Sequence, residues 1–264
     1  MRARSLGAQV IGWDPDPARL RGALEAEVLD EAAATFEALA AAAEILVLAA
    51  PLDATLQHLE VLRNAPSPAG LILDVASVKD PVARAGANVE HFIATHPIAG
   101  SERSGFAAAR ADLFAGKIWA YDGNAAGPAV ELVRAFIADM SARPLAIDPA
   151  EHDRIVAFTS HLPQLLSVLL GAELAGRLES ADVSALCGTG MASMLRLGAS
   201  SWHVWEPILR SNAAPLAQEV RAFASILMDA ATTLESGRSQ PLEPTFQAAS
   251  TAAARIQSSA EPTP

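Results

Sequence analysis

The hydrophobic residues in the first half of the chain fall into short unbroken runs, and longer stretches between them have helical periodicity. The runs lie at residues 9–13, 44–50, 70–76 and 89–95. Helical spacing of apolar positions is seen at 18–24 and 32–43. Apolar runs separated by helices are typical of parallel strands that are covered on both faces. The pattern predicts an α/β fold with a doubly wound, Rossmann-like parallel sheet.

The second half of the chain contains no further strand pattern. Helical periodicity is found at residues 149–178, 183–199, 204–235 and 242–256. Pro163 interrupts the first of these stretches, so a kink is expected there. We therefore predict a Rossmann-like domain at 1–149, an all-helical domain at 150–257 and a disordered tail at 258–264.

The predicted helix at 213–234 has a wide apolar stripe. Its members are Leu216, Val220, Phe223, Ile226, Leu227 and Leu234. A stripe of this kind is either part of the protein's own core or an interface with a second copy. The spacing favours the core and leaves the dimer interface open.

Composition and charge narrow the class of protein. The 264 residues are 51% hydrophobic, and 19 basic against 30 acidic side chains give a net charge of −11. This charge argues against nucleic acid and anionic membranes as partners. No apolar stretch is long enough for a membrane span, and no secretory leader is expected. The single cysteine, Cys187, and the scattered histidines predict neither a disulfide framework nor a metal site. We expect a cytoplasmic protein.

Two polar positions follow predicted strands in the first domain. Asp14 comes after the first run, where an acidic residue can bind the ribose of a dinucleotide, but a turn or cap before Pro15 would explain it equally well. Ser77 and Lys79 follow the third run and would face the crevice at the carboxyl ends of the strands. Ser77 could instead cap the next helix, and spacing alone favours that cap.

His96 is the strongest candidate for catalysis. It follows the fourth apolar run and begins a loop rich in glycine and hydroxyl side chains, residues 95–105. A histidine at the end of a strand has the pKa and the reach of a general base.

The helical domain adds a second polar cluster. Ser160, His161 and Gln164 surround Pro163 between apolar flanks, which indicates either a ligand site or a buried hydrogen-bond network. Arg196 stands in an apolar helical segment ahead of Trp205. If it is buried, this arginine needs a carboxylate partner, from a substrate or from the protein.

Taken together, these motifs resemble the prephenate/arogenate dehydrogenase family of tyrosine biosynthesis. The residues that carry the resemblance are Asp-Val-Ala-Ser-Val-Lys at 74–79, His-Pro-Ile-Ala-Gly-Ser-Glu at 96–102 and Ser-His-Leu-Pro at 160–163, with His152-Asp153, Arg196, Trp205 and Asn212 in the same order. The resemblance implies an NAD-dependent oxidative decarboxylation of prephenate or arogenate, performed by a homodimer whose helical domains pair.

The resemblance also implies individual roles. His96 would accept the proton of the substrate hydroxyl, and Ser77 would orient it. The implied substrate-binding residues are Ser101, Ser160, His161, Gln164, Arg196 and Trp205. The implied cofactor-binding residues are Asp14, Pro51 and Ser77, with Asp14 on the adenosine ribose.

The chain departs from the family pattern at two places. Gln164 stands where many members have a second histidine, so the choice between prephenate and arogenate stays open. The family's first strand and Gly-rich loop have no counterpart, which predicts an incomplete sheet. A misplaced start, a genuine short form and a non-catalytic, metabolite-binding relative are the three explanations, and we favour the first. A β-hydroxyacid dehydrogenase is a weaker alternative, because no lysine lies beyond Lys117.

Overall fold

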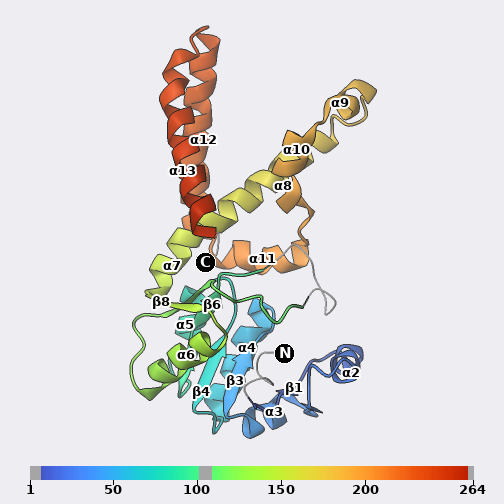
Figure 1. Ribbon diagram of the computed structural model, residues 1–264, viewed down its shortest axis with the longest axis vertical. Helices are drawn as coiled ribbons and strands as arrows, with labels where there is room; N and C mark the ends of the chain where they lie inside the picture. The colour runs from blue at the N-terminus through green and yellow to red at the C-terminus, as the bar shows by residue number, and fades with distance from the viewer. Residues whose placement is uncertain (1–6, 101–108, 261–264) are drawn as a thin grey trace. The chain divides into compact units, whose positions relative to one another are not determined.

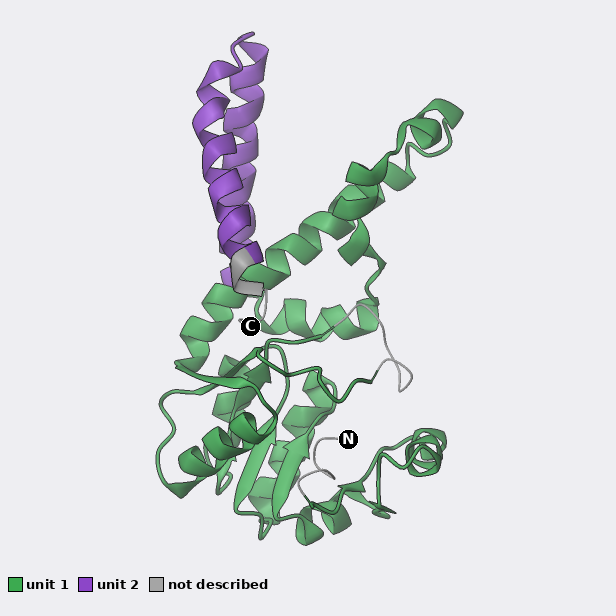
Figure 2. Ribbon diagram, viewed as in Figure 1, with its two compact units in different colours: residues 1–213 green, residues 214–264 purple. Residues whose placement is uncertain are grey.

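A computed structural model describes residues 7–100 and 109–260 (Figure 1). The chain divides into two compact units, residues 1–213 and 214–264, which are coloured separately in Figure 2. The sheets and the candidate site lie in the first unit. All described strands end before residue 149, and only helices follow it. The predicted domain boundary at 149/150 stays a prediction.

In the two described ranges, the strands form three small sheets. Their bounds are β1 (Ile11–Gly12), β2 (Glu31–Ala32), β3 (Ile45–Leu48), β4 (Leu71–Asp74), β5 (Phe92–Ile93), β6 (Thr95–Pro97), β7 (Ile118–Asp122) and β8 (Arg143–Ile147). One sheet pairs β1 with β2, a second has the order β3-β4-β5, and both are parallel. In the third sheet β6 runs antiparallel to β7, and β7 runs parallel to β8.

The predicted α/β class is confirmed, but some strand predictions were wrong. β7 and β8 were not predicted, and β6 makes an antiparallel pair in what we expected to be a parallel sheet. β2 occupies the start of the stretch predicted as helix at 32–43. The helix starts only after Thr35, whose hydroxyl accepts a hydrogen bond from the Ala38 N–H at 3.1 Å and caps it.

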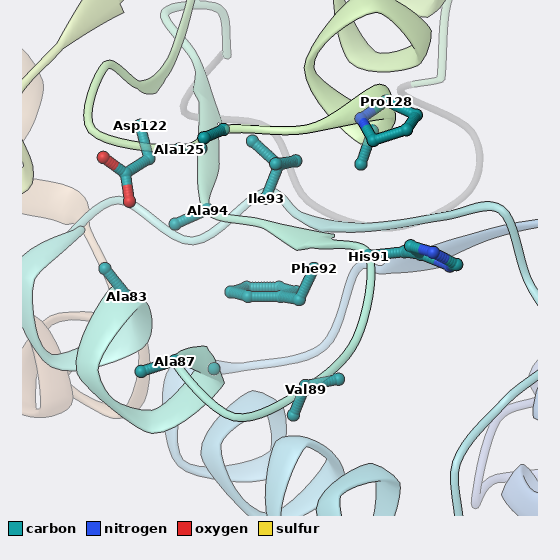
Figure 3. Close-up of a pocket in the computed structure, with 13 residues that line it drawn as sticks. Ala83, Ala87, Val89, His91, Phe92, Ile93, Ala94, Asp122, Ala125 and Pro128 are labelled. Atoms are coloured by element: carbon teal, nitrogen blue, oxygen red, sulfur yellow. The ribbon is translucent and has the colours of Figure 1, made fainter.

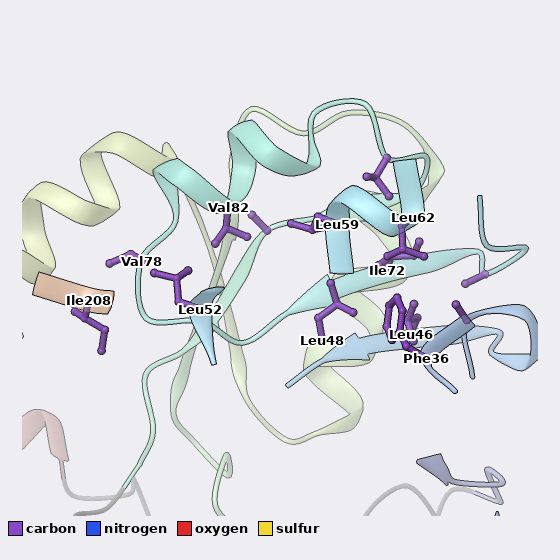
Figure 4. Packing of buried hydrophobic residues seen from close by; sticks show 14 residues of the cluster. Phe36, Leu46, Leu48, Leu52, Leu59, Leu62, Ile72, Val78, Val82 and Ile208 are labelled. Carbon is purple, nitrogen blue, oxygen red and sulfur yellow. The ribbon is translucent and has the colours of Figure 1, made fainter. Parts of the chain in front are cut away.

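Helices cover both faces of the central strand β4. The helices of this region are α2 (Pro17–Glu25), α3 (Phe36–Ala42), α4 (Leu52–Asn64), α5 (Asp80–Gly86) and α6 (Pro128–Asp139). Ile72 packs with Leu59 and Leu62 of α4 in the cluster drawn in Figure 4. On the other face, the side chains of Leu71 and Leu73 belong to a second cluster with α6. This two-sided burial explains why β4 is a continuous apolar run in the sequence.

β3 is covered on one face only within the part of the chain that the structure describes. Leu46 and Leu48 are buried in the α4 cluster, whereas Ile45 and Val47 point the other way and are 45% and 37% exposed. Among the described residues, β3 is hydrogen-bonded to β4 and not to β1.

The remaining helices follow β8. In the first unit they are α7 (Pro149–Val156), the π turn η2 (Ala157–His161), α8 (Leu162–Ala175), α9 (Ala181–Leu186), α10 (Thr189–Met194), the 3-10 turn η3 (Arg196–Ala199) and α11 (Trp202–Ser211). α12 (Ala213–Glu235), η4 (Gln240–Leu242) and α13 (Glu243–Ala260) follow. α13 includes the first three residues of the tail that we expected to be disordered, and residues 261–264 lie outside the description.

Helices α7 and α8 form one continuous helix, Pro149–Ala175, through the π turn. The expected kink at Pro163 stays a prediction. Because proline has no N–H, the helix cannot make its regular bond at that position, and the widened turn ends two residues before it. By length and composition alone the helix could cross a membrane. It also has buried polar side chains that are hydrogen-bonded to other elements, as a core helix does.

The apolar stripe of α12 is buried only in part. Leu216 is buried and Val220 and Phe223 are half-buried, but Ile226, Leu227 and Leu234 are 57%, 55% and 59% exposed, so the core that we favoured does not extend to these three residues.

Candidate functional site

A buried ion pair lies at the carboxyl end of β4. The Lys79 ammonium contacts the Asp74 carboxylate and donates to the Thr95 carbonyl at 2.6 Å. Asp74 also accepts the backbone N–H groups of Thr95 at 2.8 Å and Ala76 at 2.9 Å. Burial raises the pKa of Asp74 and lowers the pKa of Lys79, and their mutual attraction opposes both shifts. The pair ties the end of β4 to β6, the strand of His96.

The helix after this pair is capped from another element. Asp153 of α7 accepts the backbone N–H of Lys79 at 2.7 Å and that of Asp80 at 2.9 Å. The expected cap by Ser77 is wrong, because α5 has no capping bond from a nearby side chain. A carboxylate at a helix N-terminus satisfies N–H groups that have no partner in the helix. Asp153 thereby joins the helical part of the first unit to the sheet.

Two histidines and this carboxylate form a continuous chain of contacts. His96 Nδ1 lies 3.0 Å from His152 Nε2, and His152 Nδ1 lies 2.8 Å from an Asp153 carboxylate oxygen. His152 and Asp153 are each 3% exposed, while His96 is half-buried. His96 is placed at the middle of β6, not after the strand as we predicted. Its pairing with Ala120 of β7 fixes the backbone of this histidine.

Burial and the nearby Lys79 ammonium keep His96 neutral. Desolvation holds the pKa of His96 well below the usual histidine range, and the positive charge of Lys79 acts in the same direction. A neutral imidazole can accept a proton, which is the chemistry required of a general base.

A second imidazole lies beside this chain of contacts. The Asn212 side-chain amide donates to the Asp153 carbonyl at 2.8 Å and lies 3.1 Å from His161 Nδ1 through the same nitrogen. The ring of Trp205 packs edge-on against His161, with centroids 5.8 Å apart. Burial lowers the pKa of His161 to about 4. Because Nδ1 accepts from Asn212, the ring proton of His161 lies on Nε2.

This low pKa predicts a loss of stability on acidification. The unfolded chain binds a proton at His161 near pH 6.5 and the folded chain only near pH 4, so stability falls as pH drops through that window. We expect the free energy of unfolding in urea to fall by about 2 kcal/mol more between pH 7 and pH 5 than it does in a His161→Gln variant. An equal loss in both proteins would contradict the assignment.

The other predicted substrate residues lie around α8. Gln164 is buried and donates to the Leu197 carbonyl at 2.8 Å, which joins α8 to η3. Arg196 begins η3 and is exposed. The argument that a buried arginine needs a carboxylate partner therefore does not apply to it. Ser160 is exposed on the π turn, so the predicted polar patch is buried only in part. Ser101 lies outside the described residues.

The predicted cofactor residues lie beyond the carboxyl ends of strands. Asp14 follows β1, Pro51 follows β3 and Ser77 follows β4. The Asp14 carboxylate accepts the Asp16 N–H at 2.8 Å and lies 3.8 Å from Arg19, so it makes the turn contact of the alternative interpretation. In the part of the chain that the structure describes, Ser77 makes no hydrogen bond to His96. The side chain that contacts His96 is that of His152.

A cavity of about 280 Å³ lies away from this cluster (Figure 3). Ala83 of α5 and Ala87, which follows the end of α5, line one side, and Ala125 and Pro128 line another. None of the candidate residues that the structure describes lines this cavity.

Lys79 was expected only to face the crevice, and the predicted site residues did not include His152, Asp153 or Asn212. These four residues hold the cluster together. A signal for two of them was present, because His152-Asp153 precedes the apolar pair Val156-Ala157 on the helix that contains His161. Polar side chains beside a buried helix face need partners.

Comparisons with known proteins agree with this architecture. The family model described as "Prephenate dehydrogenase, nucleotide-binding domain" matches residues 1–145, and "Prephenate dehydrogenase, dimerization domain" matches residues 148–248. A probable prephenate dehydrogenase of Streptomyces niveus is 30% identical over 89% of this chain and 64% of its own length. The Bacillus subtilis prephenate dehydrogenase is 28% identical over 78% of this chain and 58% of its own. The chain spans about three fifths of these curated relatives.

Solved structures show the same fold. The chain superposes on an Aquifex aeolicus prephenate dehydrogenase, solved with hydroxyphenyl propionate and NAD+, with a TM-score of 0.87, 20% identity and coverage of 97% of this chain and 92% of that one. For a Synechocystis arogenate dehydrogenase the TM-score is 0.79, with 24% identity and coverage of 97% and 94%. The family models match both parts of the chain, and the chain belongs to the prephenate dehydrogenase family.

Proposed function

We propose that the protein catalyses the NAD-dependent oxidative decarboxylation of prephenate or arogenate in tyrosine biosynthesis. The observation that supports this most is the neutral His96, hydrogen-bonded through His152 to a buried carboxylate, in a chain of the prephenate dehydrogenase family. The relatives named above are prephenate and arogenate dehydrogenases, and one was solved with NAD+.

The strand ends fit part of a dinucleotide. The Asp14 carboxylate is one-third exposed beyond β1 and can accept a ribose hydroxyl. Pro51 and Ser77 lie level with each other, because Leu48 of β3 pairs with Asp74 of β4. Among the described residues no Gly-x-Gly-x-x-Gly turn is available for the diphosphate. When bound, NAD accepts a hydride.

In the reaction, His96 takes the proton of the substrate hydroxyl. The hydrogen on the same carbon leaves as hydride, the carbon–carbon bond to the ring carboxylate breaks, and carbon dioxide departs as the ring becomes aromatic. In this proposal the Nε2–H of His161 donates to an oxygen of the substrate, and the ring of Trp205 packs against His161. The protein's task is to position the ring and accept one proton.

Arg196 binds a substrate carboxylate in this proposal, with Ser160 and Gln164 nearby on the π turn and α8. Replacing Arg196 with alanine is expected to raise KM by about ten- to a hundredfold with a smaller effect on kcat, because a charge-assisted hydrogen bond is lost. Arg177→Ala is the matched control, since that exposed arginine pairs with Glu173 on α8. An unchanged KM in Arg196→Ala would remove the assignment.

We further propose that the protein is a homodimer through its helical part. Large apolar side chains are exposed there, including Leu186, Trp202, Met228 and Phe246. Such surfaces mark association sites. Light scattering is expected to give twice the chain mass, and Met228→Glu is expected to shift the protein toward monomer. A wild-type monomer at micromolar concentration would contradict the proposal.

The single cysteine and the net negative charge favour a cytoplasmic enzyme without nucleic acid or membrane partners. The deciding experiment is NADH formation by the purified chain with NAD and either prephenate or arogenate. Turnover of one substrate is expected, and the ratio of the two kcat/KM values would assign the preference. Binding of both without turnover would contradict the proposed activity.

A further inference from the structure

We infer that His152 and Asp153 are positioning residues that set the tautomer of His96 and stabilise the charge it gains. The catalytic consequence rests on the proposed function, whereas the tautomer itself can be observed without any substrate. Neither residue was among our predicted site residues.

The first step follows from the chemistry of Asp153. An ionised carboxylate only accepts hydrogen bonds, so the His152 nitrogen that lies 2.8 Å from it, Nδ1, bears a proton. Asp153 cannot turn away, because its two oxygens also accept the backbone N–H groups of Lys79 and Asp80. The Asn212 amide holds its backbone carbonyl as well. Asp153 is therefore held from two other elements, the start of α5 and the end of α11.

The second step passes this constraint to His96. In a neutral His152 with its proton on Nδ1, the other nitrogen, Nε2, is an acceptor. That nitrogen lies 3.0 Å from Nδ1 of His96, so Nδ1 of His96 must be the donor. A neutral His96 with its proton on Nδ1 has its lone pair on Nε2. The base is left with one available nitrogen, and the chain of contacts selects which one.

The third step concerns the charge after proton transfer. When Nε2 of His96 accepts a proton, the ring becomes a cation in a buried site that already contains Lys79. The Nδ1–H of His96 donates to His152, and the Nδ1–H of His152 donates to Asp153. The two hydrogen bonds connect the new positive charge to a negatively charged carboxylate, which stabilises it. The other charged and titratable groups that act on this chain of contacts are Lys79, which is paired with Asp74, and His161 of the π turn.

The tautomer can be determined from two-bond ¹H–¹⁵N correlations of protein labelled with [¹⁵N]histidine at pH 8. The chain has six histidines, and His96 and His152 are assigned by the signals lost in single variants. We expect both rings to be protonated on Nδ1 only. His152→Leu is expected to shift His96 toward the Nε2–H form, and His152→Gln, whose amide oxygen can replace the acceptor, to retain the Nδ1–H form. A His96 ring protonated on Nε2 in the unmodified protein, or a doubly protonated His152, would overturn the inference.

Kinetics supply a second readout. His152→Leu is expected to lower kcat by about 10- to 100-fold with KM little changed, and His152→Gln to recover part of the loss. Asp153→Asn is expected to fall between them. Asp148→Asn is the matched control, because Asp148 caps α7 in the same way, through the Glu151 N–H, and lies outside the chain of contacts.

Two outcomes separate the inference from simpler explanations. Equal kcat values for the His152→Leu and His152→Gln variants, with the His96 signals unchanged in both, would reduce His152 to a packing role. If the wild type is inactive on both substrates, the proposed function fails, while the NMR result still decides the tautomer.

Discussion

Replacement of His96 by asparagine is expected to lower kcat by about 10²- to 10⁴-fold, the usual contribution of a positioned general base. Asparagine retains a polar side chain on β6 but cannot accept a proton from a hydroxyl. Because His96 does not provide the ribose or diphosphate contacts of the cofactor, the affinity for NAD is expected to stay within a few-fold of wild type.

The measurement is steady-state NADH formation, with NAD affinity obtained by calorimetry. His91→Asn is a suitable control, because His91 has a φ of 60°, a conformation that asparagine tolerates, and it lines the separate cavity. A His96→Asn enzyme with normal kcat would exclude His96 as the base. In the wild type, the low pKa of His96 places the acid limb of kcat/KM below pH 6.5, since the base works while it is neutral.

Replacement of Lys79 by methionine is expected to cost about 3–5 kcal/mol of unfolding free energy. The side chains of Lys79 and Asp74 are 3% and 0% exposed, so methionine would leave the Asp74 carboxylate in the interior without its cation. The Thr95 carbonyl would lose a donor as well. Urea unfolding monitored by circular dichroism measures the loss.

Two further variants test the cause. The other lysine, Lys117, is exposed, and Lys117→Met is expected to change stability by less than about 0.5 kcal/mol. The double variant Asp74→Asn with Lys79→Met removes both charges and is expected to recover part of the loss. A double variant that is clearly less stable than Lys79→Met would show that Asp74→Asn adds its own independent cost. The unpaired Asp74 charge would then not be the cause of the stability loss in Lys79→Met.

The fold could be predicted where burial shapes the sequence strongly. β4 is buried on both faces and forms a continuous apolar run, and the long helices have a clear period. β7 and β8 were missed because β8 is mostly exposed and alternates little, so neither periodicity stands out. β2 has two residues, which is too short to show any pattern.

The site could be predicted in part for a similar reason. His96 was found because it lies next to a strand and a distinctive loop. The partner of His96 comes from α7, 56 residues further along the chain, and periodicity contains no information on contacts at that separation. Ser77 was assigned to a cap by local spacing, whereas the carboxylate that caps α5 is 74 residues away from Lys79. At His96 and at the start of α5, the hydrogen-bond partner comes from a distant part of the sequence and not from neighbouring residues.

The π turn at Ala157–His161 determines the angle around the helix axis between His152 and His161. In an unbroken α-helix, nine residues rotate by about 900°, so His152 and His161 would point to opposite sides. A π turn takes one extra residue to complete, so the rotation between His152 and His161 is smaller by about 100°, and His161 points back toward the side of His152.

Deleting the exposed Phe158 would let the turn close as a regular α-helix. The two histidines would then be eight residues apart and would keep the same relative angle. A deletion in α7 between His152 and the turn would instead change the angle between the two histidines by about 100°. The helix therefore holds one residue more than a regular α-helix needs between the two histidines, and we expect its removal to preserve their relative angle only at the turn.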